Sequence, residues 1–364
     1  MNSALMRCIF ICLLMCGWQS ADCLAQTVVD GSLDSSVELG DPPIDLNVAP
    51  GQSFASAAQY SEILQQASPV SPDVRSSVVD FFDDVYVPAF SVPIGWTGDP
   101  TTCDAGTTSQ AYIDASFDLI NYFRAMVKLL PVVNDVSKNA ASQEAALMMS
   151  VNNNLSHSPP PQWQCYTADG ANAAGSSNIA LGATGPRAIA LYIRDPGASN
   201  AAIGHRRWIL HPPRASFGIG SVGSGTKDAN ALWVFAGTTT RPPTDIVAWP
   251  PRGFVPYQVV YPRWSFSLNS APGADYSSAS VHMTENGVPI SLNIVSNEET
   301  RYGDNTLVWE PSGLGFSAGQ ADRVFDIEVS NVSNAGQTVF SYQVTIIDPA
   351  MMVVNPGIFT DGFE

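Results

Sequence analysis

The chain has little positive charge. Among its 364 residues, lysine and arginine together number 16 against 33 aspartates and glutamates, which gives a formal net charge of −17 at pH 7. Nucleic-acid binding requires clustered Lys and Arg side chains, and the sequence contains no such cluster, so we expect no nucleic-acid partner. Binding to anionic membrane surfaces is disfavoured for the same reason. The acidity itself indicates only solubility.

The sequence also lacks an apolar run long enough to cross a bilayer. At the N-terminus one basic residue, Arg7, precedes an apolar stretch over residues 8–18, and small side chains precede Gln26. A stretch of about 11 residues is too short for a membrane helix but suits an export signal. Residues 1–25 are therefore predicted to be a secretory signal peptide. We expect no membrane span and a secreted protein, either extracellular or periplasmic.

Cysteine is scarce once this signal is removed. Only Cys103 and Cys165 remain after residue 25. In an exported protein such a pair favours one disulfide over a metal site or a thiolate nucleophile, with two unpaired thiols as the alternative. Closing a loop of about 60 residues would stabilise the fold by roughly 4 kcal/mol on the chain-entropy model.

The residue patterns divide the rest of the chain into three parts and a tail. Residues 26–108 are acidic and rich in Ser and Pro, which predicts a partly ordered lead-in with short helices at 54–66 and 74–86. Residues 109–240 begin with a helical pattern that ends at Pro131 and a second helix, capped near Asp135, that ends near Asn153. Short helices at 188–193 and 201–210 and strands at 217–222 and 231–236 follow. This order indicates an α+β fold.

Residues 241–350 alternate between apolar and polar side chains. The alternation is clearest around Trp264, Leu307, Phe325 and Tyr342, and Asn-Gly at 286–287 is typical of a hairpin turn. Six or seven such strands predict an all-β sandwich of immunoglobulin-like type, without the inter-sheet disulfide of antibody domains. The C-terminal tail, residues 351–364, is acidic and aromatic, and is either a recognition tag or a disordered end.

Four short motifs follow one another in the middle of the chain. They are an Asn-x-x-Arg motif with Asn121 and Arg124, His157 after the second helix, an Asn-Ile pair that begins at Asn178, and a second histidine block with Gly204, His205 and Arg206. In this order they resemble the CAP superfamily, also called the SCP domain, in which the Asn-Ile pair ends a Gly-Glu-Asn-Ile motif. This family includes cysteine-rich secretory proteins, antigen-5 and pathogenesis-related proteins, and secreted bacterial relatives. The resemblance covers residues 110–237, about a third of the chain.

The resemblance implies an α-β-α sandwich with an open cleft, so the whole chain is expected to be a CAP-type α-β-α sandwich followed by the all-β immunoglobulin-like sandwich. In many relatives the cleft holds two histidines and two acidic residues that can bind a divalent cation. Here Ser177 replaces the motif's glutamate, and the second acid aligns best with Asp195. The expected ligands are therefore His157, His205 and Asp195 with Ser177 as a weak fourth group, and they would hold zinc or magnesium weakly.

Two other interpretations of these residues stay open. Both histidines could be structural, or Ser177 could form a Ser-His-Asp set with His157 and Asp195. Asn121, Arg124 and Asn178 are expected to tie the cleft loops together. Arg206 is expected to pair with carboxylates at the domain surface.

The function expected from these features is non-enzymatic. The protein would bind a small apolar or lipid-like molecule, a cation or an extracellular partner protein in the cleft of His157 and His205. One alternative is a metal-assisted hydrolase or peptidase that uses the same cleft. The other is an extracellular structural or adhesion protein that acts through the β-sandwich.

Overall fold

The computed structural model describes residues 37–45, 69–223 and 227–351. The predicted signal peptide, the expected helix at 54–66 and the tail beyond Met351 lie outside these residues. In the described part of the chain, no helix combines the length and the apolar character needed to cross a membrane. The fold is mixed, with helices around one sheet followed by two further sheets, so the predicted α+β class is confirmed.

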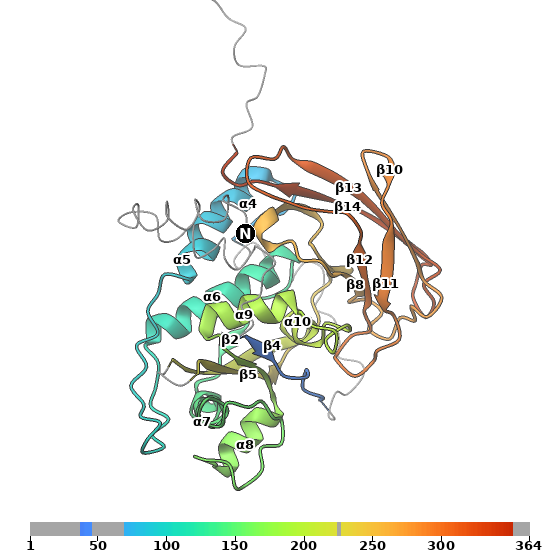
Figure 1. The fold of residues 1–364 in the computed structure, drawn as a ribbon. Helices are drawn as coiled ribbons and strands as arrows, with labels where there is room; N and C mark the ends of the chain where they lie inside the picture. The colour runs from blue at the N-terminus through green and yellow to red at the C-terminus, as the bar shows by residue number, and fades with distance from the viewer. Residues whose placement is uncertain (1–36, 46–68, 224–226, 352–364) are drawn as a thin grey trace, which may run out of the picture.

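The first sheet has the strand order β1-β3-β5-β4-β2 among the described residues. Helices α6, α9 and α10 cover one face of it, and α7 and α8 cover the other, which makes three layers (Figure 1). The strands are β1 (Glu38–Leu39), β2 (Val133–Asn134), β3 (Ser177–Leu181), β4 (Arg214–Val222) and β5 (Ala229–Thr238), and the helices are α6 (Gln110–Met126), α7 (Val136–Asn152), α8 (Ala168–Gly175), α9 (Gly185–Arg194) and α10 (Gly204–Ile209).

Strand alternation explains why both faces of this sheet are covered. Leu232 and Val234 of β5 pack into the same core as α6 and α9, whereas Ala231 and Trp233 pack against α7 and α8. Small residues let α7 approach closely: a Cβ at Gly220 of β4 would lie 2.2 Å from the backbone of α7. The two long predicted helices are confirmed as α6 and α7, and the Asp135 side chain caps α7 by accepting from the Ser137 N–H at 3.1 Å.

The lead-in contributes a helical segment to this domain. Helix α4 (Arg75–Phe81), the π-helix η1 (Phe82–Tyr86) and α5 (Val87–Ala89) follow one another, as the pattern at 74–86 predicts in part. They pack on α6 through aromatic rings: the centroids of Phe81 and Tyr122 are 4.9 Å apart, and those of Tyr86 and Phe123 are 6.2 Å apart. This part of the lead-in therefore belongs to the core.

Two sheets packed on each other form the C-terminal region, with the described strands in the orders β10-β9-β13-β14-β7 and β11-β12-β8-β6 (Figure 1). Trp264 meets Phe325, and Phe266 meets Tyr342, across the space between them. The immunoglobulin-like type stays a prediction. The strands are β6 (Ile246–Trp249), β7 (Gly253–Pro256), β8 (Trp264–Leu268), β9 (Ser280–Glu285), β10 (Val288–Pro289), β11 (Leu292–Ser296), β12 (Leu307–Pro311), β13 (Arg323–Ser330) and β14 (Val339–Ile347), with a 3-10 turn η2 (Tyr257–Val259).

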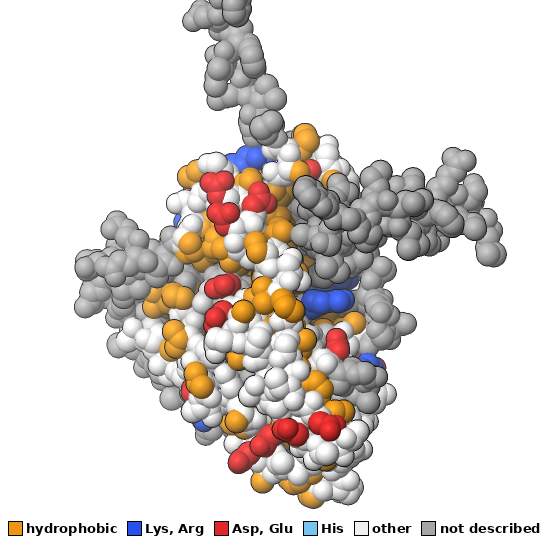
Figure 2. All heavy atoms as spheres, turned by 90° about the vertical axis from the view of Figure 1, so that its left-hand side faces the viewer, with side chains coloured by type: hydrophobic (Ala, Val, Ile, Leu, Met, Phe, Trp, Pro, Cys, Tyr) orange, Lys and Arg blue, Asp and Glu red, His pale blue; other side chains and the backbone are white. Residues whose placement is uncertain are grey.

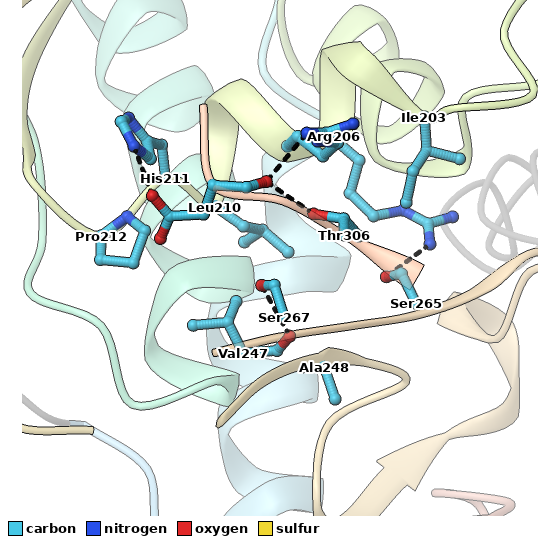
Figure 3. A pocket seen from close by; sticks show the side chains of 12 residues that line it. Ile203, Arg206, Leu210, His211, Pro212, Val247, Ala248, Ser265, Ser267 and Thr306 are labelled. Carbon is cyan, nitrogen blue, oxygen red and sulfur yellow. Dashed lines mark hydrogen bonds and ion pairs between the residues drawn. The ribbon is translucent and has the colours of Figure 1, made fainter. Parts of the chain in front are cut away.

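Buried charges join the two regions. Asp304 accepts from His211 at 3.1 Å and binds both terminal nitrogens of Arg241, while Arg207 donates to the Asp304 carbonyl at 2.9 Å. Figure 3 shows the small cavity beside these contacts, about 20 Å³ and so large enough for about one water molecule. The polar cluster fixes α10 against the β region.

Candidate functional site: a groove along the edge of β3

His205 and Asp195 form a buried pair. Asp195 follows α9 in the left-handed backbone conformation (φ 50°), which turns its side chain to the start of α10. One carboxylate oxygen accepts from His205 Nδ1 at 2.8 Å. The other accepts from the backbone N–H groups of His205 and Arg206, at 2.9 and 3.2 Å. One oxygen of Asp195 therefore caps α10, whose N-cap residue Ile203 offers no side-chain cap, and the other oxygen holds the His205 ring.

The His205 ring has no exposed surface. It stacks on Tyr192 with 5.5 Å between the ring centroids. Its Nε2 has no hydrogen-bond partner among the residues that the structure describes. The sequence predicts a solvent-open cleft at this ring, but in the structure the ring is buried and has no contact with solvent.

His157 is partly exposed and lies against two carbonyl groups. Its Nδ1 is 2.6 Å from the carbonyl oxygen of Ala174 at the end of α8, and its Nε2 contacts the carbonyl oxygen of Asp41. A neutral imidazole has one N–H, so it donates to only one of these oxygens at a time. Both ring nitrogens face protein oxygens, and neither is directed at an open position for a metal ion.

Ser177 points away from the buried pair. Its neighbour Asn178 faces α9 and α10, because the Asn178 amide donates to the His205 carbonyl at 3.1 Å. Side chains alternate along a strand, so Ser177 faces the opposite layer with Ile179, which packs against α7 and α8. The Ser177 hydroxyl has no partner in the described part of the chain. The expected set is thus divided, with Ser177 on one face of the sheet and His205 with Asp195 on the other.

A segment of the lead-in lies along the free edge of β3, and we call residues 37–45 the strap. In β1, Glu38 pairs with Leu181 and Leu39 with Ala180, and the Gly40 N–H donates to the Ile179 carbonyl at 3.1 Å. After Gly40 the strap contacts His157, whose Nε2 lies against the Asp41 carbonyl oxygen. It thereby extends the sheet by one short strand.

The second half of the strap runs over α10. Pro42 and Pro43 are buried, and Pro42 lies so close to Gly204 that a Cβ there would be 2.5 Å from the proline ring. The Trp208 indole N–H donates to the Pro43 carbonyl at 2.8 Å. We call the surface that contacts the strap the strap groove; it consists of the edge of β3, His157, Gly204 and Trp208.

A cation lies at each end of the strap groove. Lys227 is 3.0 Å from Glu38, and Arg214 is 2.9 Å from Asp45. Burial lowers the pKa of Arg214, and the hydrogen bond and charge of Asp45 oppose this shift. On the face of the molecule that Figure 2 shows, acidic side chains gather in several places and basic ones are few.

The residues expected to tie loops together lie at loop junctions. The Asn121 side chain binds the backbone N–H and carbonyl of Val132, at 2.8 and 3.0 Å. Arg124 is fully buried and donates to the carbonyls of Ile209 and Arg214, at 2.7 and 3.1 Å. These bonds hold α6 to the segment that follows α10.

Arg206 differs from its expected surface role. It is buried and donates to the carbonyls of Ile193 and Arg263, at 2.6 and 2.8 Å, rather than to surface carboxylates. Burial lowers its pKa to about 10, although the charge of Asp195 opposes the shift. The basic pattern of the motif suggested exposure, but carbonyl groups at the end of α9 satisfy this guanidinium inside the protein.

Cys103 and Cys165 form the predicted disulfide. It connects the segment before α6 to the segment that follows His157, on the side of the sheet that carries α7 and α8. The strap, by contrast, was missed in the sequence. Its signal was Pro42-Pro43 between acidic residues, which is also typical of a linker.

The three-layer architecture of the central region fits the α-β-α sandwich that the resemblance of its motifs implies. A family model described as CAP, the cysteine-rich secretory protein family, matches residues 117–236, from within α6 to within β5. The middle of the chain is therefore a CAP domain, and the β-rich region follows it. No curated protein matches the chain.

Among the residues that the structure describes, no three His, Cys, Asp or Glu side chains gather closely enough to hold a metal ion. Zinc or magnesium binding by His157, His205 and Asp195 stays a prediction. To form that site, His157 would have to leave the two carbonyls that it now contacts.

Proposed function

We propose that this protein is a secreted, non-enzymatic CAP-domain protein that binds a partner polypeptide, in extended form, in the strap groove. The single observation that carries the proposal is the way the groove holds residues 37–45. Gly40 pairs with the edge of β3, and the carbonyls of Asp41 and Pro43 meet His157 and Trp208.

These three contacts use backbone groups. A backbone N–H and backbone carbonyls are present in any polypeptide, so the groove can hold a segment of another protein in the same way. Addition of a strand to a sheet edge is a common mode of peptide recognition, in which the backbone supplies affinity and side-chain pockets supply selectivity. An uncovered edge of β3 would also expose unpaired backbone N–H and carbonyl groups. Pairing of this edge with another polypeptide segment is therefore favourable.

A catalytic function has less support. Both oxygens of Asp195 already accept hydrogen bonds from the start of α10, His205 is enclosed, and Ser177 faces the other layer. The Ser-His-Asp interpretation would require the β3 strand to reverse its faces. The hydrolase alternative would require a metal ion, so a zinc titration without uptake would exclude it. Stoichiometric zinc uptake that is lost in His157→Ala/His205→Ala, together with hydrolysis of a peptide substrate by the zinc-loaded chain, would favour the hydrolase.

Secretion has indirect support. A disulfide persists in oxidising compartments, and the CAP family match fits an exported protein. Export of the full chain followed by N-terminal sequencing tests this part of the proposal. The expected first residue of the mature protein is Gln26, and retention of the first 25 residues would contradict it.

A second candidate function is binding of a small apolar molecule. Tyr257, Tyr261, Trp264, Leu314 and Phe316 line a cavity of about 320 Å³ between the end of α9 and the β region. This volume is at the lower end of the range for ligand pockets, and four of the ten lining residues are aromatic. Quenching of Trp264 fluorescence by a long-chain fatty acid would favour this function, and the Trp264→Phe variant is its control.

Peptide selection tests the main proposal. A display library of 12-residue peptides is panned against the full mature chain with Gly40→Val, which places a side chain against Ile179 and so keeps the strap from covering the groove. The selected peptides are then measured against the same chain with Trp208→Phe or Trp309→Phe added. Both tryptophans are fully buried, but only Trp208 belongs to the strap groove. The proposal expects the peptides to bind at least tenfold more weakly to Trp208→Phe and unchanged to Trp309→Phe. Peptides that bind both variants equally would show that the groove is not their site.

A further inference from the structure

We infer that the strap is a built-in competitor for the strap groove, and that the partner's segment is acidic and contains proline. The strap pattern Glu-x-Gly-x-Pro-Pro-x-Asp (residues 38–45) describes what the groove accepts. A partner carrying such a segment binds by displacing the strap. This inference rests on the proposed function and adds the class of partner and its regulation.

The ends of the groove select for negative charge. Lys227 is one of only three lysines in a chain of net charge −17, and it lies against Glu38. At the other end Arg214 lies 5.0 Å from the centre of the Trp208 ring and binds Asp45. An occupant with basic residues at both ends would face two cations, and the Arg214 charge is almost fully buried.

The centre of the groove selects by shape. Gly40 lies where a Cβ would be 2.6 Å from the Ile179 side chain, so a larger residue is disfavoured at this position of the occupant. Two positions further on, Pro42 fills the space above Gly204 and is buried, as is Pro43. Proline fixes its own backbone angle, so a Pro-Pro segment loses less conformational entropy when it binds in extended form.

The contacts that hold the strap are ones that a partner segment can replace. Its β1 strand has only two residues, and the side chains of Glu38, Asp41 and Ile44 are exposed. It competes because it is tethered: a covalently linked segment has an effective concentration in the millimolar range, which raises the apparent Kd of any partner. Weakening the strap should therefore increase the affinity for a free peptide without any change in the groove.

The experiment uses the full mature chain and a fluorescein-labelled peptide with the sequence of residues 36–47. Two strap variants are compared with the parent: Gly40→Val, which places a side chain against Ile179, and Glu38→Arg/Asp45→Arg, which repels Lys227 and Arg214. Gly336→Val is the matched control, because a Cβ at Gly336 meets no atom within 4 Å. Fluorescence anisotropy gives the Kd of each protein.

Both strap variants are expected to bind the peptide at least tenfold more tightly than the parent and Gly336→Val. Peptides with both prolines replaced by alanine, or both end carboxylates replaced by lysine, are expected to bind at least tenfold more weakly. Hydrogen exchange of residues 37–45 shows that the strap has left the groove, and circular dichroism shows that the domain is folded. If Gly40→Val does not fold, the comparison is made with Glu38→Arg/Asp45→Arg alone.

Each other outcome overturns a different statement. If parent and strap variants bind equally, the groove takes polypeptides but the strap is not a competitor. If the lysine or alanine peptides bind as well as the parent sequence, the acidic, proline-containing class is wrong. If dimers form by exchange of straps, the occupant is a second copy of this chain rather than a foreign partner. If neither strap variant binds any peptide, the proposed function itself fails.

Discussion

Trp208 donates its indole N–H to the carbonyl oxygen of Pro43 at 2.8 Å, across 165 residues of sequence. Both residues are buried, so the Pro43 carbonyl has no access to solvent when this bond is lost. The bond joins the strap to α10, the helix that also carries His205. Helix α10 therefore holds both the strap and the buried His205–Asp195 pair in place.

The variant Trp208→Phe tests this support. It keeps a ring in the core but leaves the buried Pro43 carbonyl unpaired, which costs about 1–3 kcal/mol. We expect backbone amides of the strap, the Gly40 N–H in particular, to exchange with solvent about tenfold faster, measured by hydrogen–deuterium exchange. Trp309→Phe is the control, because the Trp309 indole has no partner among the described residues. Equal exchange rates in parent and Trp208→Phe would mean that the bond does not hold the strap.

Replacement of Gly204, on the same helix as Trp208, by alanine should also loosen the strap. A Cβ at this position would lie 2.5 Å from Pro42 and 2.9 Å from Tyr302, so the proline ring must move. We expect a loss of about 1–3 kcal/mol in the free energy of unfolding, measured by urea denaturation. Helix propensity alone would give the opposite sign, since alanine is a better helix former than glycine.

Gly273→Ala is the control for this variant. A Cβ at Gly273 meets no atom within 4 Å, so this substitution is expected to change stability by less than about 0.5 kcal/mol. If Gly204→Ala is as stable as Gly273→Ala, the close packing of Pro42 on α10 is not maintained in solution.

Local patterns were sufficient to predict most of the elements. The run from Gln110 and the cap at Asp135 gave α6 and α7, because helical periodicity and capping are properties of neighbouring residues. Alternation around Trp264 and Phe325 gave β8 and β13 for the same reason. Short strands such as β10, with two residues, were missed because they are too short to show a period.

The candidate site could be predicted only in part. His205 and Asp195 were expected together and are in contact, but the expectation that Ser177 joins them ignored the alternation of β3. The strap could not be predicted from its own residues. Its partners, Ile179 and Trp208, lie far along the chain, and its acidic, proline-containing composition is that of a linker.

The disulfide makes a prediction about global stability. The bridge between Cys103 and Cys165 closes a loop with a sequence separation of 62 residues, so the double variant Cys103→Ala/Cys165→Ala is expected to lose roughly 4 kcal/mol of unfolding free energy. Urea denaturation measures the loss. Titration of thiols in the denatured, unreduced protein should find none from these two positions. Two reactive thiols there would contradict the bridge.

Because His211 is buried, we expect the free energy of unfolding to depend on pH. Burial lowers the pKa of His211, and the adjacent Asp304 carboxylate only partly opposes this shift. For Asp304 itself, burial alone would raise the pKa, but the charges and hydrogen bonds of His211 and Arg241 hold it at about 2, so it stays ionised above pH 4.

The folded pKa of His211 thus lies below its unfolded value of about 6.5. Between these values the unfolded chain binds more protons, so the stability from this residue is complete above pH 6.5 and is lost as the pH falls.

Thermal denaturation at pH 7.5 and pH 5.5 measures this loss. His211→Gln, which keeps a donor for Asp304 but cannot titrate, is expected to lose less stability over that interval than the parent. The control is His282→Gln on the exposed face of β9, which should behave like the parent. If parent and His211→Gln lose equal stability, the buried cluster that joins α10 to the β region does not control the acid response of the protein.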